Sequence, residues 1–232
     1  MKRFPKYLQL FLVLFCAGFC TAQTKTSLDA AEFEKAISGS DSVQLLDVRT
    51  PQEFNGGHLA NALLADWKQE QEFLRRVSFM DKEKAVFVYC LGGGRSAEAA
   101  EKMREMGYKY VYELKGGINA WKAGNKPVEG RSSEKQMSLS AFNTAVNVPG
   151  NVLVDFGATW CPPCRKMEPV LQSLGVNYAG KFSLLKIDGG KDEEVLKQYN
   201  VTQLPVFILF KDGKQVWRKE GIVSEKEIAD QL

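Results

Sequence analysis

Short apolar runs alternate with amphipathic stretches in the first half of the chain. The runs are rich in β-branched and aromatic residues and have the length of buried strands, whereas the stretches around them have helical spacing. The predicted strands are 43–48, 85–90 and 110–114. The predicted helices are 27–37, 96–107 and 118–123. Strands that alternate with helices indicate a mostly parallel sheet.

A second series of strands and helices follows a polar stretch at 124–137, which contains Pro, Gly and Ser without periodicity and predicts a domain boundary. The predicted helices after it are 138–146, 162–175, 192–199 and 224–232. The predicted strands are 151–158, 182–188 and a hairpin within 205–221. We therefore expect an α/β chain with two domains, at 27–130 and 138–232, joined by a linker at 131–137.

The first 22 residues have the pattern of a secretory signal peptide. A basic start precedes an apolar stretch of about a dozen residues, too short for a comfortable membrane span. Cys20 and Ala22 then provide small residues for cleavage, which predicts a periplasmic or secreted protein with no membrane contact. The alternative is a lipoprotein signal with a lipid anchor at Cys20, although bulky Phe19 is unsuited to it. The least favoured interpretation is that the segment is not cleaved and remains as a membrane anchor.

Charge and cysteine usage narrow the function classes. Lys2, Arg3 and Lys6 account for the whole net charge of +3, so we expect no nucleic-acid partner. Removal of the signal leaves three cysteines, one close pair and one odd thiol, which is not a disulfide framework. An unpaired thiol in an exported protein is expected to be reactive. We expect a monomer that needs no cofactor or metal.

The odd thiol, Cys90, follows a buried strand, where α/β sheets place their ligands. Three glycines and the start of a helix come next, so backbone N–H groups are expected to turn toward the sulfur and stabilise an anion. Arg95 is expected to close this ring. The loop predicted to cradle a thiolate or persulfide consists of Leu91, Gly92, Gly93, Gly94 and Ser96. The alternative is a buried structural cysteine before a glycine-rich turn.

The segment "YCLGGGRS" resembles the Cys-x-x-Gly-x-Arg-Ser loop of the rhodanese family. The segments 45–63 and 114–129 are similar to its other two signatures. The resemblance implies a rhodanese fold and a Cys90 that carries sulfane sulfur as a persulfide. Four residues separate Cys90 from Arg95, where related phosphatases have five, which favours a single sulfur atom over an oxyanion. The loop lacks the second cation that efficient thiosulfate-using members often have, so the sequence does not identify the sulfur donor.

Three upstream residues within the same signature carry further expectations. Asp47 and Arg49 are expected to form an ion pair that braces the loop. His58, the single histidine of the chain, is interpreted as structural.

The segment "WCPPC" places two cysteines at a strand-to-helix junction. A helix N-terminus favours the thiolate of Cys161, which would attack, and Cys164 would resolve the mixed disulfide. Pro162 suits the first helical turn. A structural zinc site is the alternative, but this half has too few ligands for it. Asp155 interrupts an apolar strand, so it is expected to be buried with a raised pKa and to exchange a proton with Cys164, unless it is a salt-bridged core acid.

Residues 136–232 resemble thioredoxin through "VDFGATWCPPCRKMEPVL" and "VTQLPVFILFKDGK". The resemblance implies a thioredoxin fold and a redox-active disulfide between Cys161 and Cys164. It also implies supporting roles for Trp160, for Asp155 with Lys186, and for Pro205 as the cis-proline that offers a backbone edge to substrate. Two features depart from the family: the cysteines are separated by Pro-Pro, and Leu204 precedes Pro205. The sequence therefore does not decide whether the pair acts as a reductant or as an oxidant.

Together the two sites predict an exported sulfurtransferase and thiol–disulfide oxidoreductase. Cys90 would carry the persulfide, and the Cys161–Cys164 dithiol would reduce or accept it. The expected partners are a sulfane-sulfur donor or persulfide, protein thiols or disulfides, and an external reductant. The alternatives are a general exported thiol–disulfide oxidoreductase, whose first half binds or positions a partner, and a pair of non-enzymatic interaction modules.

Overall fold

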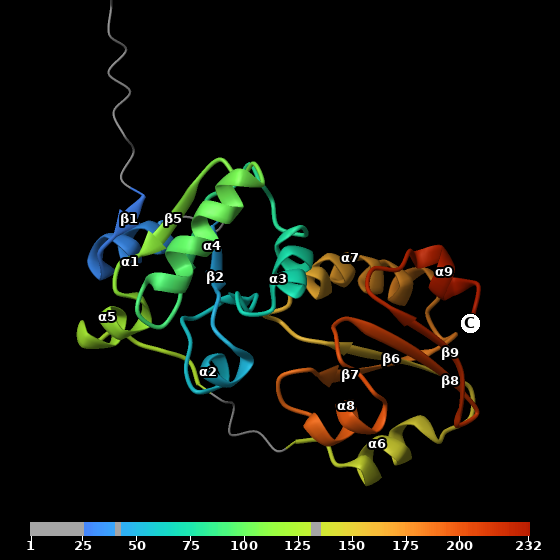
Figure 1. Cartoon of the computed structure of the whole chain (residues 1–232). Helices are drawn as coiled ribbons and strands as arrows, with labels where there is room; N and C mark the ends of the chain where they lie inside the picture. Colours follow the sequence, from blue (N-terminus) through green and yellow to red (C-terminus); the bar gives the residue numbers. More distant parts are fainter. Residues whose placement is uncertain (1–25, 40–42, 131–135) are drawn as a thin grey trace, which may run out of the picture.

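The computed structural model describes residues 26–39, 43–130 and 136–232 (Figure 1). The predicted signal segment 1–22, with Cys20 and Ala22, lies outside the described residues, as does most of the predicted linker. The domain boundary within 131–137 therefore stays a prediction. In the described part of the chain, no helix combines the length and the hydropathy that crossing a membrane requires.

The first domain is a five-stranded, fully parallel sheet with helices on both faces. Its elements are β1 (Ser27–Leu28), α1 (Ala30–Ser38), β2 (Gln44–Asp47), α2 (Pro51–Asn55), β3 (Leu63–Leu64), α3 (Glu70–Val77), β4 (Val86–Tyr89), α4 (Gly94–Glu105), β5 (Val111–Leu114) and α5 (Gly117–Ala123). The strand order is β1-β5-β4-β2-β3. Helices α3 and α4 cover one face, while α1, α2 and α5 cover the other.

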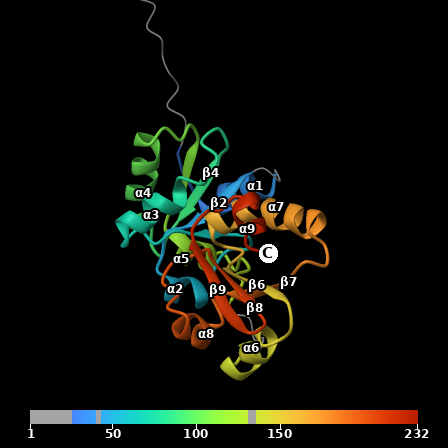
Figure 2. The same ribbon diagram turned by 90° about the vertical axis from the view of Figure 1, so that its right-hand side faces the viewer.

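The second domain is a four-stranded mixed sheet in the order β7-β6-β8-β9. Its elements are α6 (Leu139–Val146), β6 (Asn151–Gly157), α7 (Pro162–Asn177), β7 (Ser183–Asp188), α8 (Glu193–Gln198), β8 (Val206–Lys211), β9 (Lys214–Glu220) and α9 (Glu225–Ala229). Helices α6 and α8 pack on one face, and α7 and α9 on the other (Figure 2). The predicted α/β fold class, a parallel sheet followed by a second α/β domain, is confirmed.

Several elements differ from the sequence prediction. The first helix starts at Ala30, because Asp29 caps it and accepts hydrogen bonds from two N–H groups of its first turn. The two residues before Asp29 form β1, which pairs with β5. Helix α4 starts at Gly94 because Gly93, with φ of 106°, makes the turn sharper than expected. The short elements α2, β3 and α3 were not expected.

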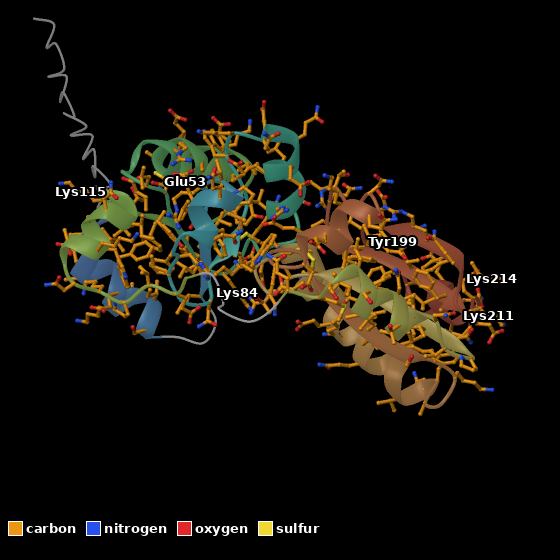
Figure 3. All side chains as sticks on the ribbon, turned by 90° about the horizontal axis from the view of Figure 1, so that it is seen from below. Glu53, Lys84, Lys115, Tyr199, Lys211 and Lys214 are labelled. Carbon is orange, nitrogen blue, oxygen red and sulfur yellow. A yellow bond between two sulfur atoms is a disulfide. The ribbon has the colours of Figure 1, made fainter. Side chains whose placement is uncertain are left out.

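The two domains touch through α3 and the end of β3 in the first domain and through the segment at the start of α7 in the second. Helix α3 of the first domain lies beside the start of α7 in the second (Figure 1). Trp160 packs against the apolar cores of both domains. The far end of the second sheet, marked by Lys211 and Lys214 at its hairpin, points away from the first domain (Figure 3). The contact therefore concentrates on the segment that contains the cysteine pair.

Phe142 tests the separate core of the second domain. Its ring is fully buried on α6 and packs against Phe156, Tyr199 and Phe210. We expect Phe142→Ala to lower the free energy of unfolding by about 3–5 kcal/mol, because it removes a buried ring and leaves a cavity. Chemical denaturation would measure the change, with exposed Asn143→Ala as the control. A loss no larger than the control's would contradict this account of the core.

Candidate functional site

Cys90 follows β4 directly and is 1% exposed. The N–H of Gly93 donates to its sulfur at 3.1 Å, and the hydroxyl of Ser96 lies 3.4 Å from the same atom. Cys90 is in no disulfide. Sequence reasoning expected several inward N–H groups, whereas the described structure gives one N–H and one hydroxyl at the sulfur. The Ser96 hydroxyl also lies 3.0 Å from the Gly93 carbonyl oxygen, so the Gly93 N–H is the donor committed to the sulfur. A hydrogen bond from a backbone N–H makes a sulfur better suited to carry negative charge.

The outer face of the loop is open while its sulfur is covered. Leu91 is 43% exposed, and the backbone at Gly92 and Gly94 is also exposed. The loop is held from behind by α5, whose residues Ile118 and Asn119 donate backbone hydrogen bonds to the carbonyls of Cys90 and Leu91.

Gly117 is a supporting residue that sequence reasoning missed. A Cβ at this position would lie 2.4 Å from the Cys90 carbonyl oxygen, so the close approach of α5 requires glycine. The sequence feature that could have indicated this role is the Gly116–Gly117 pair, which follows β5.

Arg95 does not close a ring around the sulfur as expected. Its guanidinium forms a bidentate ion pair with Glu53 on α2, with nitrogen-to-oxygen distances of 2.6 and 2.8 Å. This hydrogen bonding lowers the pKa of the Glu53 carboxyl to about 2. The pair ties the first turn of α4 to α2, so Arg95 acts on the loop as a brace. Figure 3 shows Glu53 on the first domain.

Asp47 and Arg49 form the ion pair that the sequence predicted. Their side chains are buried, and the Nη2 atom of Arg49 lies 2.6 Å from Asp47 and donates to the Gly57 carbonyl at 2.7 Å. The guanidinium lies over the ring of Tyr89, the residue before Cys90. His58 stacks on Phe54, and its Nδ1 is 3.0 Å from the Phe54 carbonyl, which fits the structural role expected for it.

Cys161 and Cys164 are joined by a disulfide at the start of α7. Cys161 is the N-cap residue, and the N–H of Cys164 donates to its sulfur at 3.3 Å. Both cysteine residues are buried, with Cys161 0% exposed and Cys164 9% exposed. The residue expected to attack is therefore the more deeply buried one in this arrangement.

Asp155 lies on β6 and is 8% exposed. Burial raises the pKa of its carboxyl to about 6, although the charge of Lys186 opposes the increase. Lys186 stands opposite Asp155 in the parallel pairing of β6 with β7. A cavity of about 510 Å³ in the second domain is lined by Asp155, Lys186 and Cys164 together. The carboxylate thus faces the same space as the resolving sulfur.

The first domain occupies the backbone edge around Trp160 and Pro205. The Leu64 N–H donates to the Trp160 carbonyl at 2.8 Å, and the Arg75 guanidinium donates to the Leu204 carbonyl at 2.9 Å. The Leu204–Pro205 peptide bond is cis. We call these two hydrogen bonds the interdomain clasp. The clasp fixes one residue on either side of the cysteine pair, at the edge that the thioredoxin resemblance assigns to substrate.

Glu72 and Arg76 support the clasp. The Glu72 carboxylate contacts Arg75 at 2.6 and 2.8 Å and Arg76 at 2.6 Å. Arg76 in turn lies over the Trp160 ring, 5.2 Å from its centroid, and donates to the Leu64 carbonyl. Sequence reasoning missed this group because α3 was not expected and nothing in the sequence showed which surface it would face.

The clasp lies on the same sheet edge as Cys90. Strands β4, β2 and β3 are parallel neighbours, so Cys90 after β4 and Leu64 at the end of β3 lie at the carboxyl edge, about 10 Å apart across the strands. An interdomain cavity of about 510 Å³ at this edge is lined by Leu64, Asp66 and Arg76 from the first domain and by Thr202 and Gln203 from the second. The two sulfur sites therefore share one side of the first domain.

Known protein families match each half of the chain. The Rhodanese-like domain model matches residues 29–124, and the Thioredoxin model matches residues 133–232. A thioredoxin-like protein of Synechocystis sp. is 40% identical over 84 residues, which cover 36% of this chain and 80% of that protein. The chloroplast thioredoxin Y of Oryza sativa subsp. japonica is 36% identical over 103 residues, 44% of this chain and 61% of that protein, which is less than two thirds.

A solved structure matches the first half. It is the solution NMR structure of a rhodanese-like domain from an Anabaena sp. protein, with 30% identity and a TM-score of 0.42. The match covers 48% of this chain and 84% of that chain.

Asp155 tests the electrostatics of this site through the pH dependence of stability. Because its folded pKa is raised from 3.8 to about 6, the folded state prefers the neutral acid. The free energy of unfolding of the oxidised protein should therefore fall as the pH rises from about 4 to 6, by at most ~3 kcal/mol, and then level off. Asp155→Asn should remove this decrease. Denaturation between pH 4 and 8 would measure it, with exposed Glu194→Gln as the control.

Proposed function

Because the chain belongs to the thioredoxin family and carries a rhodanese-like domain before its thioredoxin domain, we propose that it reduces sulfane sulfur held on Cys90. The two domains together support a thiol–disulfide oxidoreductase and sulfurtransferase type of role. The finer proposal is that both activities form one reaction sequence, in which the first domain supplies the substrate of the second. The observation that carries it is the shared sheet edge, where Cys90 and the interdomain clasp lie on one side of the first domain.

Loading takes place at Cys90. The Cys90 thiolate attacks the outer sulfur of a sulfane donor or a small persulfide, and the donor's remaining thiol or sulfite leaves with the bonding electron pair. The product is a persulfide whose charge lies on the terminal sulfur. The Gly93 N–H donates to the Cys90 sulfur to which the added sulfur atom is bonded, and the Ser96 hydroxyl lies beside that inner sulfur. The Arg95–Glu53 pair keeps the loop in this shape.

Transfer uses the reduced dithiol. The Cys161 thiolate attacks the Cys90 persulfide, either at the outer sulfur or at the inner one, where it forms a mixed disulfide with Cys90 and releases hydrosulfide. The Cys164 thiolate then attacks the sulfur of Cys161. Two electrons pass from the dithiol to the sulfane sulfur, so the products are hydrosulfide, the free Cys90 thiol and the Cys161–Cys164 disulfide. An external reductant must then restore the dithiol.

The clasp sets a requirement on this sequence. With Leu64 and Arg75 bonded at the edge, Cys161 is fully buried. Cys161 must therefore become exposed before it attacks any partner, including Cys90, and we propose that opening of the clasp exposes it. Opening breaks one backbone hydrogen bond, which contributes about 1 kcal/mol, and one charge-assisted hydrogen bond, which contributes about 1.5–3 kcal/mol. It also separates Trp160 from Arg76 and from the apolar core of the first domain.

The clasp also favours a second candidate function. The first domain occupies the substrate edge of the second, so it has the geometry of a positioning or capping module. A general exported thiol–disulfide oxidoreductase would use it in this way and would transfer little sulfur at Cys90. The proposed setting in either case is the bacterial periplasm or the exterior, with a lipid anchor at Cys20 as the alternative. The proposed protein partners are thiols and disulfides of other chains.

The reaction sequence is tested in the full chain by measuring sulfur loading of Cys90 and the subsequent release of sulfide. The reduced protein is treated with a polysulfide or thiosulfate, desalted and analysed by mass spectrometry. We expect the Cys90 peptide to gain the mass of one sulfur atom. Sulfide release from the loaded protein should follow in the wild type and be at least about tenfold slower in Cys161→Ser, because the attacking thiolate is absent.

Two variants separate the candidate functions. Cys90→Ser should abolish sulfur loading while it leaves insulin disulfide reduction intact. Equal sulfide release by the wild type and Cys161→Ser would contradict the coupled sequence. A Cys90 peptide that never gains sulfur, in Cys161→Ser as well as in the wild type, would instead leave the general oxidoreductase as the function.

A further inference from the structure

The interdomain cavity beside the clasp contains two buried charges of opposite sign. Asp66, two residues after β3, is 8% exposed, and Arg76 on α3 is 9% exposed. Both line the cavity of about 510 Å³, which Thr202 and Gln203 line from the second domain. Among the described residues, the structure shows no hydrogen bond or ion pair between the Asp66 and Arg76 side chains. Each is therefore able to bind a group that enters the cavity.

The Asp66 carboxylate has an oxygen available for a ligand. Its Oδ1 accepts the Lys68 N–H at 3.0 Å, and within the described ranges its Oδ2 has no hydrogen-bond or ion-pair partner. The pKa of Arg95 is raised chiefly by its hydrogen bonds to Glu53. The charges of Cys90 and Asp66 raise it further, so both lie near the same guanidinium. Oδ2 can therefore accept a hydrogen bond from an ammonium group that is held close to the Cys90 loop.

The Arg76 guanidinium has a nitrogen available in the same way. Its Nε donates to the Glu72 carboxylate at 2.6 Å, and its Nη1 donates to the Leu64 carbonyl at 2.9 Å. In the part of the chain that the structure describes, its Nη2 donates to no acceptor. A guanidinium nitrogen is well suited to bind a carboxylate. The cavity thus offers an acceptor for a cation and a donor for an anion.

The charges around the cavity cancel. Asp66, Glu72 and Arg76 line it, and Arg75 binds Glu72 from outside the lining. Two carboxylates thus face two guanidinium groups, and one group of each sign has an atom available. Such a site is poorly matched to a dianion such as thiosulfate, and it complements a zwitterion. An α-amino acid is a small zwitterion of this kind, and its side chain stays available to carry a reactive group.

The cavity lies at the sheet edge where Cys90 is placed. Backbone hydrogen bonds continue the strand pairing past the strand ends, from the Trp67 N–H to Val48 and from the Val48 N–H to Tyr89. Asp66 and Cys90 are therefore about 10 Å apart, measured across two strand spacings. The Asp66 side chain, one hydrogen bond and a short ligand together span such a distance. Because Cys90 is 1% exposed, its loop must shift when sulfur is transferred.

We propose that the interdomain cavity binds a zwitterionic α-amino acid whose side chain ends in sulfane sulfur, and that this persulfide is the donor for Cys90. Asp66 binds its ammonium group and Arg76 binds its carboxylate. The inference deepens the proposed function and rests on it for the fate of the sulfur, whereas binding rests on the cavity alone.

The transfer step is balanced without a further reagent. The Cys90 thiolate attacks the outer sulfur of the bound persulfide, and a new sulfur–sulfur bond forms at Cys90. The sulfur–sulfur bond of the donor breaks, and its electron pair leaves with the amino acid as a thiolate. The sulfane sulfur keeps its oxidation level, so the step needs no oxidant or reductant.

Binding is tested in the full chain with Cys90→Ser, so that a failure of sulfur loading cannot affect the result. The probe is S-methyl-L-cysteine, in which a methyl group replaces the outer sulfur, and calorimetric titration measures its affinity. It should bind about tenfold or more tightly than 3-(methylthio)propanoate, which lacks the ammonium group, and 2-(methylthio)ethylamine, which lacks the carboxylate. Each analogue loses one charge-assisted hydrogen bond. Equal affinities for the three compounds, or no binding of the first, would overturn the proposal.

Asp66→Asn locates the site, because asparagine keeps the acceptor for the Lys68 N–H and removes the charge. The affinity for S-methyl-L-cysteine should fall by about tenfold or more. Glu105→Gln, at an exposed position at the end of α4, should leave it unchanged. An unchanged affinity in Asp66→Asn would contradict the assignment. If this variant fails to fold, the comparison of the three compounds still decides the matter.

The donor role is tested with Cys90 intact. Cysteine persulfide should load Cys90 about tenfold or more faster than the persulfide of 2-mercaptoethanol, and Asp66→Asn should remove most of this preference. Equal loading rates in the wild type would overturn the donor assignment. A Cys90 that no donor loads, in a protein that still binds S-methyl-L-cysteine, would instead contradict the proposed function and leave the binding site established.

Discussion

The interdomain clasp is the contact on which the rest of the molecule depends. A backbone N–H of β3 and a guanidinium of α3 bind the carbonyls of Trp160 and Leu204, one on each side of the cysteine pair. A backbone carbonyl that is buried without a hydrogen-bond donor destabilises the folded protein. Leu64 and Arg75 supply those donors from within the same chain. The first domain is therefore docked on the backbone edge that the thioredoxin resemblance assigns to substrate.

In this arrangement the two sulfur sites lie on the same side of the first domain, but both cysteines are buried. Cys90 and Leu64 lie on one edge of the first sheet, yet both Cys90 and Cys161 are buried. Both thiols are therefore shielded from solvent in the closed form. Glu72 strengthens the closed form, because it holds Arg75 and Arg76 in the conformations that reach the second domain. Opening breaks these hydrogen bonds and withdraws Trp160 from the apolar core of the first domain, but each domain keeps a core of its own.

The sequence was sufficient for the architecture, for the place of Cys90 after a buried strand and for the place of the cysteine pair at the start of a helix. Strand and helix periodicity marked the two α/β domains, and burial of Asp155 followed from its place in an apolar strand. Arg95 shows where the argument from sequence failed: its partner, Glu53, is 42 residues away on a short helix that no periodicity announced. The clasp was beyond sequence reasoning for a similar reason. Donors and acceptors that are satisfied across a domain interface carry no local pattern, and Arg75 resembles any exposed helical arginine.

The exposure of Cys161 tests the clasp most directly. In the reduced full chain with Cys90→Ser and Cys164→Ser, the alkylation rate of the Cys161 peptide by iodoacetamide is compared with and without Arg75→Ala. Loss of a charge-assisted hydrogen bond should increase that rate by about tenfold or more, because the open form becomes more populated. Lys68→Ala, at an exposed position shortly before the same helix, should leave it unchanged. Equal rates with arginine and alanine at position 75 would show that the first domain does not control access to Cys161.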